Sequence, residues 1–275
     1  MPELPEVETI RAALAPVLEG HRLEDVTILD PRLTRPHDPR EVEAELTGEG
    51  IVRLDRRGKY LVVRFRTSRA LLIHLRMTGS LQYASGGTLQ DDPYRRAVIR
   101  LDNGSDVAYR DVRRFGTWLL LESAEVEPYL DLKNGPEPLG RTFTTRFLAK
   151  RLSGRRAPIK AAILDQRTVA GLGNIYADEG LWHARIHPLR PAGTLDEQEV
   201  SRVRSGARRA LKTGIARQGA TLRDYRTPEG RSGSMQEEFK VYGRAGESCP
   251  RCGTPIEKIR AGGRGTWYCP SCQRL

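Results

Sequence analysis

All four cysteines of this chain lie in its last 27 residues, from Cys249 to Leu275. They form two pairs, Cys249-x2-Cys252 and Cys269-x2-Cys272, with sixteen residues between the pairs. Two pairs at this spacing are typical of one zinc ion held by four thiolates on two knuckles, and free or redox-active thiols are the alternative. Because so short a segment cannot bury a large core, the ion would replace one, which predicts a closed, structural zinc site.

The residues between the two cysteine pairs favour a β-hairpin. Its tip would be Gly262-Gly263-Arg264-Gly265, because glycines accept the backbone conformations that tight turns require. A guanidinium at such a tip is well suited to bind a phosphate or to enter a nucleic-acid groove. Arg264 is therefore a candidate functional residue.

The charge of the chain is unevenly distributed. The formal net charge is +11 over 275 residues, of which residues 141–275 carry +14 and residues 1–140 carry −3. Such a basic surface indicates a polyanionic partner, and nucleic acid is the usual one for a protein without a membrane anchor. A charge that serves only solubility is the alternative. No segment has the apolar length of a membrane span, and the acidic Glu3, Glu6 and Glu8 argue against a signal peptide. We expect a cytoplasmic protein with two domains.

The chain opens with Met1-Pro2-Glu3-Leu4-Pro5-Glu6. If Met1 is removed, Pro2 becomes a terminal secondary amine, which can attack an electrophilic sugar carbon and pass directly to an iminium ion. Apolar residues then recur at helical spacing as far as Gly20, so Pro2 would lie at the positive end of a helix. That position favours the free amine and nearby carboxylates such as Glu3 and Glu6. Without other evidence, a proline-led helix with acidic first-turn residues explains the same pattern.

The region that follows has the composition of β-strands. Runs of β-branched, aromatic and apolar residues separated by turn signals predict an N-terminal β-sandwich. The expected strand segments are Ile51 to Phe65 with a turn at Gly58, Ala70 to Leu81, Tyr94 to Leu101, and Val107 to Leu121, the last two joined by Asp102-Asn103-Gly104. Six side chains in this region could face a ligand, although an ordinary solvated sheet face explains each one taken alone: Lys59, His74, Met77, Arg113, Arg114 and Phe115.

A Gly- and Pro-rich linker at residues 131–143 precedes a helical region. The expected helices are Thr144 to Leu152, Ile159 to Gln166, Asn174 to Ala184, and Leu195 to Arg217, the last opened by a capping box at Thr194 and Glu197. Gly171-Leu172-Gly173-Asn174, just before a helix, would let a phosphate approach backbone N–H groups, or is an ordinary turn with an Asn cap. Residues 219–237 are polar and rich in Gly and Arg, which predicts a flexible loop.

Several motifs occur together in one order along the chain. They are Met-Pro-Glu-Leu-Pro-Glu-Val-Glu-Thr at the start, Arg57-Gly58-Lys59-Tyr60-Leu61, His74-Leu75-Arg76-Met77-Thr78-Gly79-Ser80, Arg113-Arg114-Phe115-Gly116, Gly171 to Glu179, and the four-cysteine finger. Together they resemble the formamidopyrimidine-DNA glycosylase and endonuclease VIII family over essentially the whole chain. The Pro-Glu-Leu-Pro-Glu start resembles the formamidopyrimidine branch, which excises 8-oxoguanine and ring-opened purines.

This resemblance implies catalytic roles for four residues. Pro2 would attack C1′ of the damaged nucleoside, release the base and leave a Schiff base with the DNA. Glu3 would donate a proton for opening of the sugar. Lys59 would assist β-elimination of the 3′ phosphate, and Arg264 would assist the δ-elimination that leaves a one-nucleotide gap.

The resemblance also implies DNA contacts. The base must leave the stack, which costs a few kcal/mol, and inserted side chains would offset part of this cost. The void-filling residues would be Met77, Arg113 and Phe115, and the phosphate contacts would be His74, Lys160 and Asn174. Tyr94 and Arg155 stand where relatives commonly place His and Lys, and we keep them as expected DNA contacts. Substrate binding would involve Glu6 and the loop residues Leu222, Arg223, Asp224 and Tyr225, with Ala220 standing where a hydroxyl residue is frequent.

The sequence thus predicts an α+β protein with four parts. They are a catalytic β-sandwich at 1–130, a linker at 131–143, a helix-two-turn-helix domain with a lesion-recognition loop at 144–240, and a zinc finger at 241–275. We expect a monomeric DNA glycosylase and abasic-site lyase with one structural Zn²⁺, acting on damaged double-stranded DNA. An endonuclease VIII-like enzyme for oxidised pyrimidines, or a zinc-finger DNA-binding protein without catalysis, are the alternatives.

Overall fold

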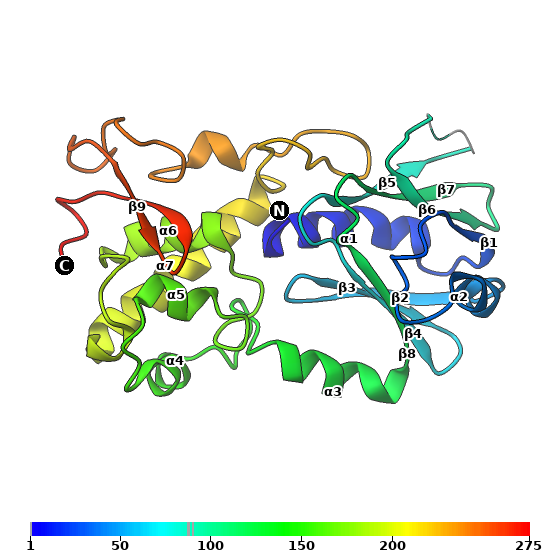
Figure 1. Cartoon of the computed structure of the whole chain (residues 1–275), viewed down its shortest axis with the longest axis horizontal. Coiled ribbons are helices and arrows are strands. Elements are labelled where there is room, and N and C mark those ends of the chain that lie inside the picture. The colour runs from blue at the N-terminus through cyan, green and yellow to red at the C-terminus, as the bar shows by residue number, and fades with distance from the viewer. Residues whose placement is uncertain (1, 87–88, 90) are drawn as a thin grey trace. The chain divides into compact units, whose positions relative to one another are not determined.

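The computed structural model describes residues 2–86, 89 and 91–275, and its chain divides into two compact units (Figure 1). The first, which we call the sandwich unit, comprises Met1–Asp131 and Gln218–Ser234. The second, the helical unit, comprises Leu132–Arg217 and Met235–Leu275. The predicted α+β class, with an N-terminal sandwich and a C-terminal finger hairpin, is confirmed.

Two four-stranded antiparallel sheets form the sandwich unit. One has the strand order β1-β6-β7-β5 and the other β2-β3-β4-β8. Their strands are β1 (Leu23–Ile28), β2 (Ile51–Arg57), β3 (Tyr60–Phe65), β4 (Arg69–His74), β5 (Gly79–Ala84), β6 (Arg95–Leu101), β7 (Asp106–Asp111) and β8 (Thr117–Glu122). The Asp102-Asn103-Gly104 turn joins β6 to β7 as predicted, with Gly104 at a φ of 77°.

The core of this unit follows from strand alternation. On β3, Leu61, Val63 and Phe65 belong to the main core, whereas Val62 faces the other side of the sheet. Helix α1 (Leu4–Leu18) contributes most of its buried apolar residues to the same main core. Helix α3 (Ser123–Lys133), which the sequence did not reveal, packs Val126 and the following turn against Val62 on the opposite face. Both faces of the second sheet are therefore covered.

Two of the expected long strands are broken. The segment Ala70 to Leu81 divides into β4 and β5, and Val107 to Leu121 divides into β7 and β8, so that each half joins a different sheet. The connecting corners contain Arg76 and Arg114 with φ of 52° and 58°, a region that residues other than glycine adopt infrequently. The corners between sheets, rather than the strands, carry several of the candidate residues.

The helical unit contains four α-helices after α3 and a two-stranded hairpin. They are α4 (Thr145–Leu152), α5 (Ile159–Leu164), α6 (Asn174–Ala184), α7 (Glu197–Ala216), β9 (Glu257–Ala261) and β10 (Arg264–Tyr268). The predicted capping box at Thr194 and Glu197 is wrong: Asp196 caps α7 and Glu199 completes the box. Thr194 instead ends a short 3-10 turn, where its hydroxyl donates to the carbonyl of Pro191.

Helices α6 and α7 pack closely because glycines meet at their contact. A side chain on Gly206 would collide with the backbone carbonyl of Gly180. Farther along α7, a side chain on Gly214 would collide with the ring of Tyr176. The contact therefore holds α6, which begins directly after the Gly171-Leu172-Gly173 segment, against the longest helix of the unit.

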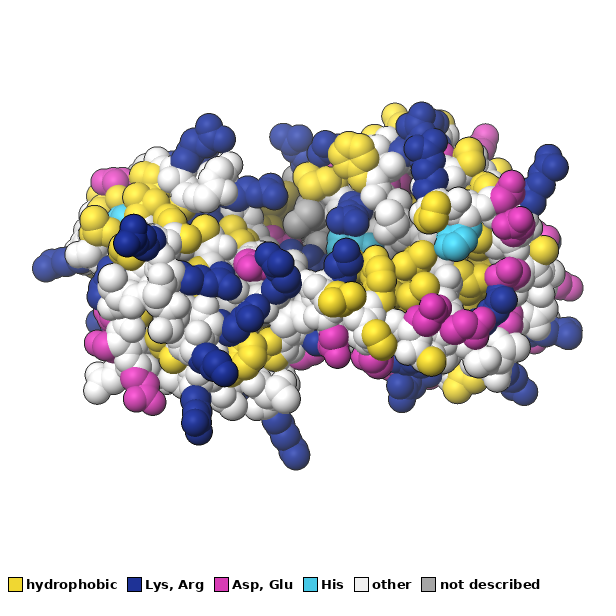
Figure 2. All heavy atoms as spheres, turned by 60° about the horizontal axis from the view of Figure 1, so that its bottom comes forward, with side chains coloured by type: hydrophobic (Ala, Val, Ile, Leu, Met, Phe, Trp, Pro, Cys, Tyr) yellow, Lys and Arg dark blue, Asp and Glu magenta, His cyan; other side chains and the backbone are white. Residues whose placement is uncertain are grey.

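Lys and Arg are the most frequent charged side chains over the helical unit on the face drawn in Figure 2. Among the described residues, no helix combines the length and the apolar character needed to cross a lipid bilayer.

Candidate active site and nucleic-acid interface

Pro2 and Glu3 lie buried at the N-terminal end of α1. Glu3 is the residue that precedes the helix, with an extended backbone, and it is 2% exposed. Its backbone N–H donates to Oε2 of Glu6 at 2.7 Å, which fixes the first turn of the helix. Met1 lies outside the described residues. The predicted nucleophile and the predicted proton donor are thus neighbours at the positive end of one helix.

Glu6 also fastens the loop that follows α7. Its second oxygen, Oε1, accepts the backbone N–H of Ala220 at 2.8 Å. Gly219 has a φ of 81°, and a Cβ there would lie 2.7 Å from Cγ of Glu6, so both the conformation and the contact require glycine. One buried carboxylate therefore joins the start of α1 to residues 219–220.

The loop is anchored a second time by Tyr225, which is 8% exposed and packs in the main core of the sandwich unit. Its hydroxyl donates to the carbonyl of Gln218 at 3.1 Å, and burial raises the pKa of this phenol. Leu222, Arg223 and Asp224 remain exposed. The loop predicted at 219–237 therefore packs largely with the sandwich unit, which is why Gln218–Ser234 groups with it.

The same loop and β5 line a hollow of about 250 Å³. Its lining includes three guanidinium groups and only one carboxylate. The hollow therefore suits a polar ligand with acceptor atoms. The lining residues are Ser80, Leu81, Gln82, Arg110, Arg223, Asp224, Arg226 and Thr227.

Lys59 lies in the tight turn between β2 and β3, after Gly58 with a φ of 60°, and is 7% exposed. His74 ends β4 directly opposite Tyr60, and their rings meet edge to face at 4.6 Å. Burial, together with the charges of Arg76 and Lys59, lowers the pKa of His74 from 6.5 to about 3. Because its Nδ1 accepts the backbone N–H of Arg76 at 3.1 Å, the proton of the neutral ring resides on Nε2, which can donate to a phosphate.

The neutral state of His74 predicts a pH dependence of stability. In the unfolded chain the imidazole binds a proton near pH 6.5, whereas in the folded chain it does so only near pH 3. Its contribution to folding is therefore complete above pH 6.5 and is lost as the pH falls toward 3. Relative to His74→Gln, the wild type should lose up to about 1.4 kcal/mol of unfolding free energy per pH unit in this range. Urea unfolding of both chains from pH 7.5 to 4.5 measures this, and a constant difference would contradict it.

Asp111 organises the two corners that carry Met77, Arg113 and Phe115. This carboxylate is 1% exposed and accepts the hydroxyl of Thr78 from the first corner. From the second corner it accepts backbone N–H groups at 2.8 to 3.2 Å, those of Arg113, Phe115 and Gly116. Four bonds to one buried carboxylate fix both corners relative to each other.

The backbone of Asp111 extends this network. Its N–H donates to the carbonyl of Tyr94 at 2.9 Å, and Tyr94 is 40% exposed beneath Arg110, whose guanidinium lies 5.0 Å from the ring centre. In the second corner Phe115 is 52% exposed, and Arg113 lies 4.7 Å over its ring. Sequence reasoning missed Asp111, although an aspartate at a strand end before a turn is a known signal for side-chain to backbone bonds.

In the helical unit, Asn174 is the first residue of α6 and Gly173 precedes the helix, so the reading of Asn174 as a cap is wrong. The side-chain Nδ2 of Asn174 donates to the carbonyl of Gly265 at 3.1 Å. Asn174 therefore joins the start of α6 to the finger hairpin. Arg155 is partly exposed and lies 3.6 Å from the carboxylate of Asp165.

Lys160 differs from its predicted role. Its side chain is fully buried and pairs with Asp178 at 2.7 Å, so the ammonium does not lie at a surface where a phosphate would bind. It donates to the carbonyl of Gly265 at 2.9 Å and to the hydroxyl of Thr266 at 2.8 Å. Lys160 thus holds the start of β10 in place. The exposed Arg264 directly precedes Gly265, at the hairpin turn that the sequence predicted.

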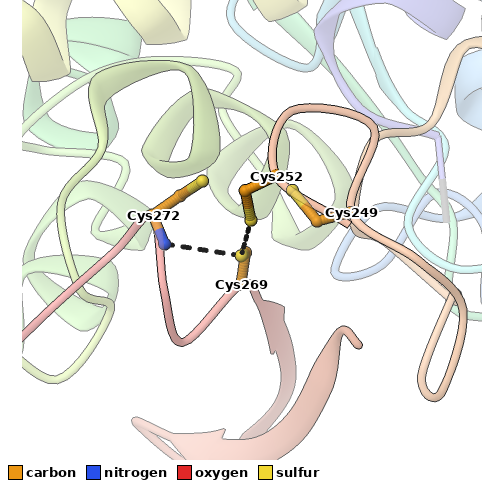
Figure 3. A group of neighbouring side chains, drawn as sticks. All are labelled: Cys249, Cys252, Cys269 and Cys272. Carbon is orange, nitrogen blue, oxygen red and sulfur yellow. Dashed lines mark hydrogen bonds between the residues drawn. The ribbon is translucent and has the colours of Figure 1, made fainter. Parts of the chain in front are cut away.

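The four cysteines converge on one space at the base of this hairpin (Figure 3). Their four Sγ atoms lie within 4.8 Å of one another, and Sγ of Cys252 and of Cys269 are 3.4 Å apart. Thiolates around a tetrahedral zinc ion lie about 3.8 Å apart, given Zn–S bonds of about 2.3 Å. The donor set and its spacing fit one structural Zn²⁺, as predicted.

Three family models match the chain. The formamidopyrimidine-DNA glycosylase N-terminal domain matches residues 1–118, its H2TH domain matches 134–226, and a zinc finger found in FPG and IleRS matches 246–275. Formamidopyrimidine-DNA glycosylase of Symbiobacterium thermophilum is 47% identical over 99% of this chain and 89% of its own length. That of Moorella thermoacetica is also 47% identical, over 94% of this chain and 95% of its own length.

Solved structures agree with these matches. A variant of the Lactococcus lactis FPG protein in complex with Fapy-dG-containing DNA is 37% identical, has a TM-score of 0.93, and is matched over 100% of both chains. The same bacterium's Fpg with DNA containing an abasic site is 36% identical, with a TM-score of 0.92, over 99% of this chain and 100% of that one. The chain belongs to the formamidopyrimidine-DNA glycosylase family. The predicted enzyme class, a DNA glycosylase with abasic-site lyase activity, is confirmed.

Proposed function

We propose that this chain removes oxidised purines, 8-oxoguanine and formamidopyrimidines, from double-stranded DNA through a Schiff base on Pro2. Once Met1 is removed, the lone pair of the Pro2 nitrogen forms a bond to C1′ while the bond from C1′ to the damaged base breaks. Glu3 donates a proton to the sugar oxygen, so the ring opens and an iminium remains. The location of Pro2 beside buried Glu3 at the start of α1 is the observation that carries this proposal.

Strand cleavage follows from the iminium, which acidifies the neighbouring C2′–H. Loss of that proton expels the 3′ phosphate in a β-elimination, and a second elimination expels the 5′ phosphate. We assign assistance of the first step to Lys59, and of the second step to Arg264. Lys59 sits in a tight turn, and Arg264 is exposed at the hairpin turn that Lys160 and Asn174 brace.

The exposed corners of the sandwich unit supply the void-filling groups. Met77, Arg113 and Phe115 would occupy the space that the extruded base leaves, with Arg113 facing the orphaned cytosine. DNA phosphates would be bound by His74 through its Nε2 proton, and also by Tyr94, Arg155 and Asn174. Lys160 is not assigned a phosphate; it holds the hairpin that carries Arg264.

The loop at 219–237 is proposed to receive the damaged purine. Glu6 and Tyr225 anchor it, whereas Leu222, Arg223 and Asp224 are exposed and two of them line the hollow beside β5. Backbone N–H groups of residues 222–225 would recognise the base by donating hydrogen bonds to it. We further propose a catalytic domain at 1–130, a linker at 131–143, a DNA-binding helical domain at 144–240 and a finger at 241–275, in a cytoplasmic, nucleoid-associated monomer.

Excision rates test the substrate class. Duplexes containing 8-oxoguanine, Fapy-dG or thymine glycol, each opposite the four bases, should be compared under single-turnover conditions. One Lactococcus lactis Fpg structure contains DNA with an oxidised pyrimidine, which makes the third lesion a necessary comparison. Faster release of the two purine lesions supports the proposal. Faster release of thymine glycol would favour an endonuclease VIII-like enzyme, and binding without any excision would favour a non-catalytic protein.

The Asp111 network predicts a loss of lesion affinity. Asp111→Asn removes the charge that holds both corners, and bonds to a charged group contribute about 1.5 to 3 kcal/mol. Affinity for a duplex with a stable abasic-site analogue should therefore fall about 10-fold or more, while affinity for undamaged duplex changes little. Asp106→Asn, on the same strand and bonded to Arg100, is the matched control. Equal losses in both variants would contradict the assignment.

A further inference from the structure

The zinc site has a neighbour outside the finger, Trp182, near the C-terminal end of α6. Its indole Nε1–H donates to Sγ of Cys249 at 3.4 Å, within the normal range for a bond to sulfur. Trp182 is 7% exposed, and Cys249 is 2% exposed. The bond is therefore shielded from water. A donor to a charged sulfur has its largest effect where water is excluded.

The indole is held so that its N–H keeps this direction. Its ring belongs to a small apolar cluster with Val241, Ile256, Cys249 and Cys269. Arg251 lies 3.9 Å over the ring and donates from Nη1 to the carbonyl of Trp182 at 3.1 Å. The apolar cluster and the guanidinium of Arg251 thus hold the indole ring in one orientation.

We propose that Trp182 is an outer-shell residue of the zinc site that stabilises Cys249 as a thiolate ligand. One Zn²⁺ with four thiolates carries a net charge of about −2, which a buried site must offset with hydrogen-bond donors. Part of that stabilisation comes from the finger itself, because the backbone N–H of Cys272 donates to Sγ of Cys269 at 3.4 Å. Trp182 adds a donor from a different element of the fold.

This bond joins the metal site to the helix that begins with Asn174. Along α6, Asn174 bonds the carbonyl of Gly265, Asp178 accepts the backbone N–H of Trp267 at 3.1 Å, and Trp182 bonds Cys249. The helix and the finger are therefore connected at three successive levels. Zinc occupancy and the order of the C-terminal half of α6 become linked through Trp182.

Trp182→Phe tests the proposal in the full-length chain, because phenylalanine keeps an aromatic ring and removes the N–H donor. Loss of an outer-shell partner typically weakens metal binding about 10- to 100-fold, so competition with a chromophoric chelator should show at least a 10-fold lower zinc affinity. Trp267→Phe is the matched control, since it makes the same change in the finger itself and leaves the Trp267 backbone bond to Asp178 intact. Wild-type zinc affinity in a folded Trp182→Phe chain would overturn the proposal.

A measurement on the wild type decides the question if the variant does not fold. In a chain with ¹⁵N-labelled tryptophan, substitution of zinc by ¹¹³Cd should produce a through-hydrogen-bond coupling between the metal and one indole proton. That resonance should also shift and exchange faster with water when a chelator removes the metal. Indole resonances that show neither coupling nor response to metal removal would overturn the assignment.

Discussion

A chain whose Pro2 nitrogen is locked in an amide is expected to lose base excision almost completely. Insertion of one serine before Pro2 achieves this, because removal of Met1 then leaves serine at the terminus. An amide nitrogen has no available lone pair, so neither attack on C1′ nor an iminium is possible. The single-turnover rate on an 8-oxoguanine duplex should fall by at least about 10³-fold, the scale seen when covalent enzymes lose a nucleophile.

Two comparisons make this result specific. Pro2→Gly retains a terminal amine, so it should keep part of the activity that the extended chain loses. Affinity of the extended chain for a duplex with an abasic-site analogue should stay within a few-fold of wild type, because Met77, Arg113 and Phe115 are unchanged. An extended chain that excises at the wild-type rate would require a different nucleophile.

Loss of a zinc ligand should have the second largest effect, and it should be confined to the helical unit. Cys269 is fully buried, and the finger packs few apolar residues of its own around the four thiols. Structural zinc sites contribute about 10 to 16 kcal/mol of binding free energy, which in such small segments is folding free energy. Cys269→Ser should therefore unfold the hairpin that carries Arg264 and reduce DNA affinity, while the sandwich unit stays folded.

Metal analysis, limited proteolysis and DNA titration together measure this effect. The Cys269→Ser chain should contain less than one zinc ion per chain and be cleaved within residues 246–275. Ser271→Ala lies between Cys269 and Cys272 and removes no ligand, so it should behave as wild type. A Cys269→Ser chain with full zinc content and unchanged DNA affinity would show that the finger does not depend on the ion.

Much of the fold could be predicted because local signals were strong. The cysteine spacing defined the finger and its turn, and Asp102-Asn103-Gly104 defined the β6–β7 hairpin. The two breaks between sheets were missed because an apolar run has no mark where a strand leaves one sheet for another. Only tertiary packing puts Arg76 and Arg114 at positive φ, and those positions adjoin Met77, Arg113 and Phe115.

The site itself was predicted from motifs, and its supporting contacts were not. Glu6 reaches Ala220 across 214 positions of sequence, and no local pattern indicates such a pair. Lys160 was expected to bind a phosphate, and only the tertiary structure shows that its side chain is buried against Asp178. Motifs identify residues that touch substrate, whereas residues that hold them depend on distant parts of the chain.

Trapping of the covalent intermediate tests the central claim most directly. Borohydride added to the enzyme with an 8-oxoguanine duplex reduces any iminium to a stable amine, and mass spectrometry of the digested adduct locates the bond. We predict that the DNA is attached to the nitrogen of Pro2 in a peptide that begins at that residue. Attachment to Lys59, or to any other amine, would contradict the account.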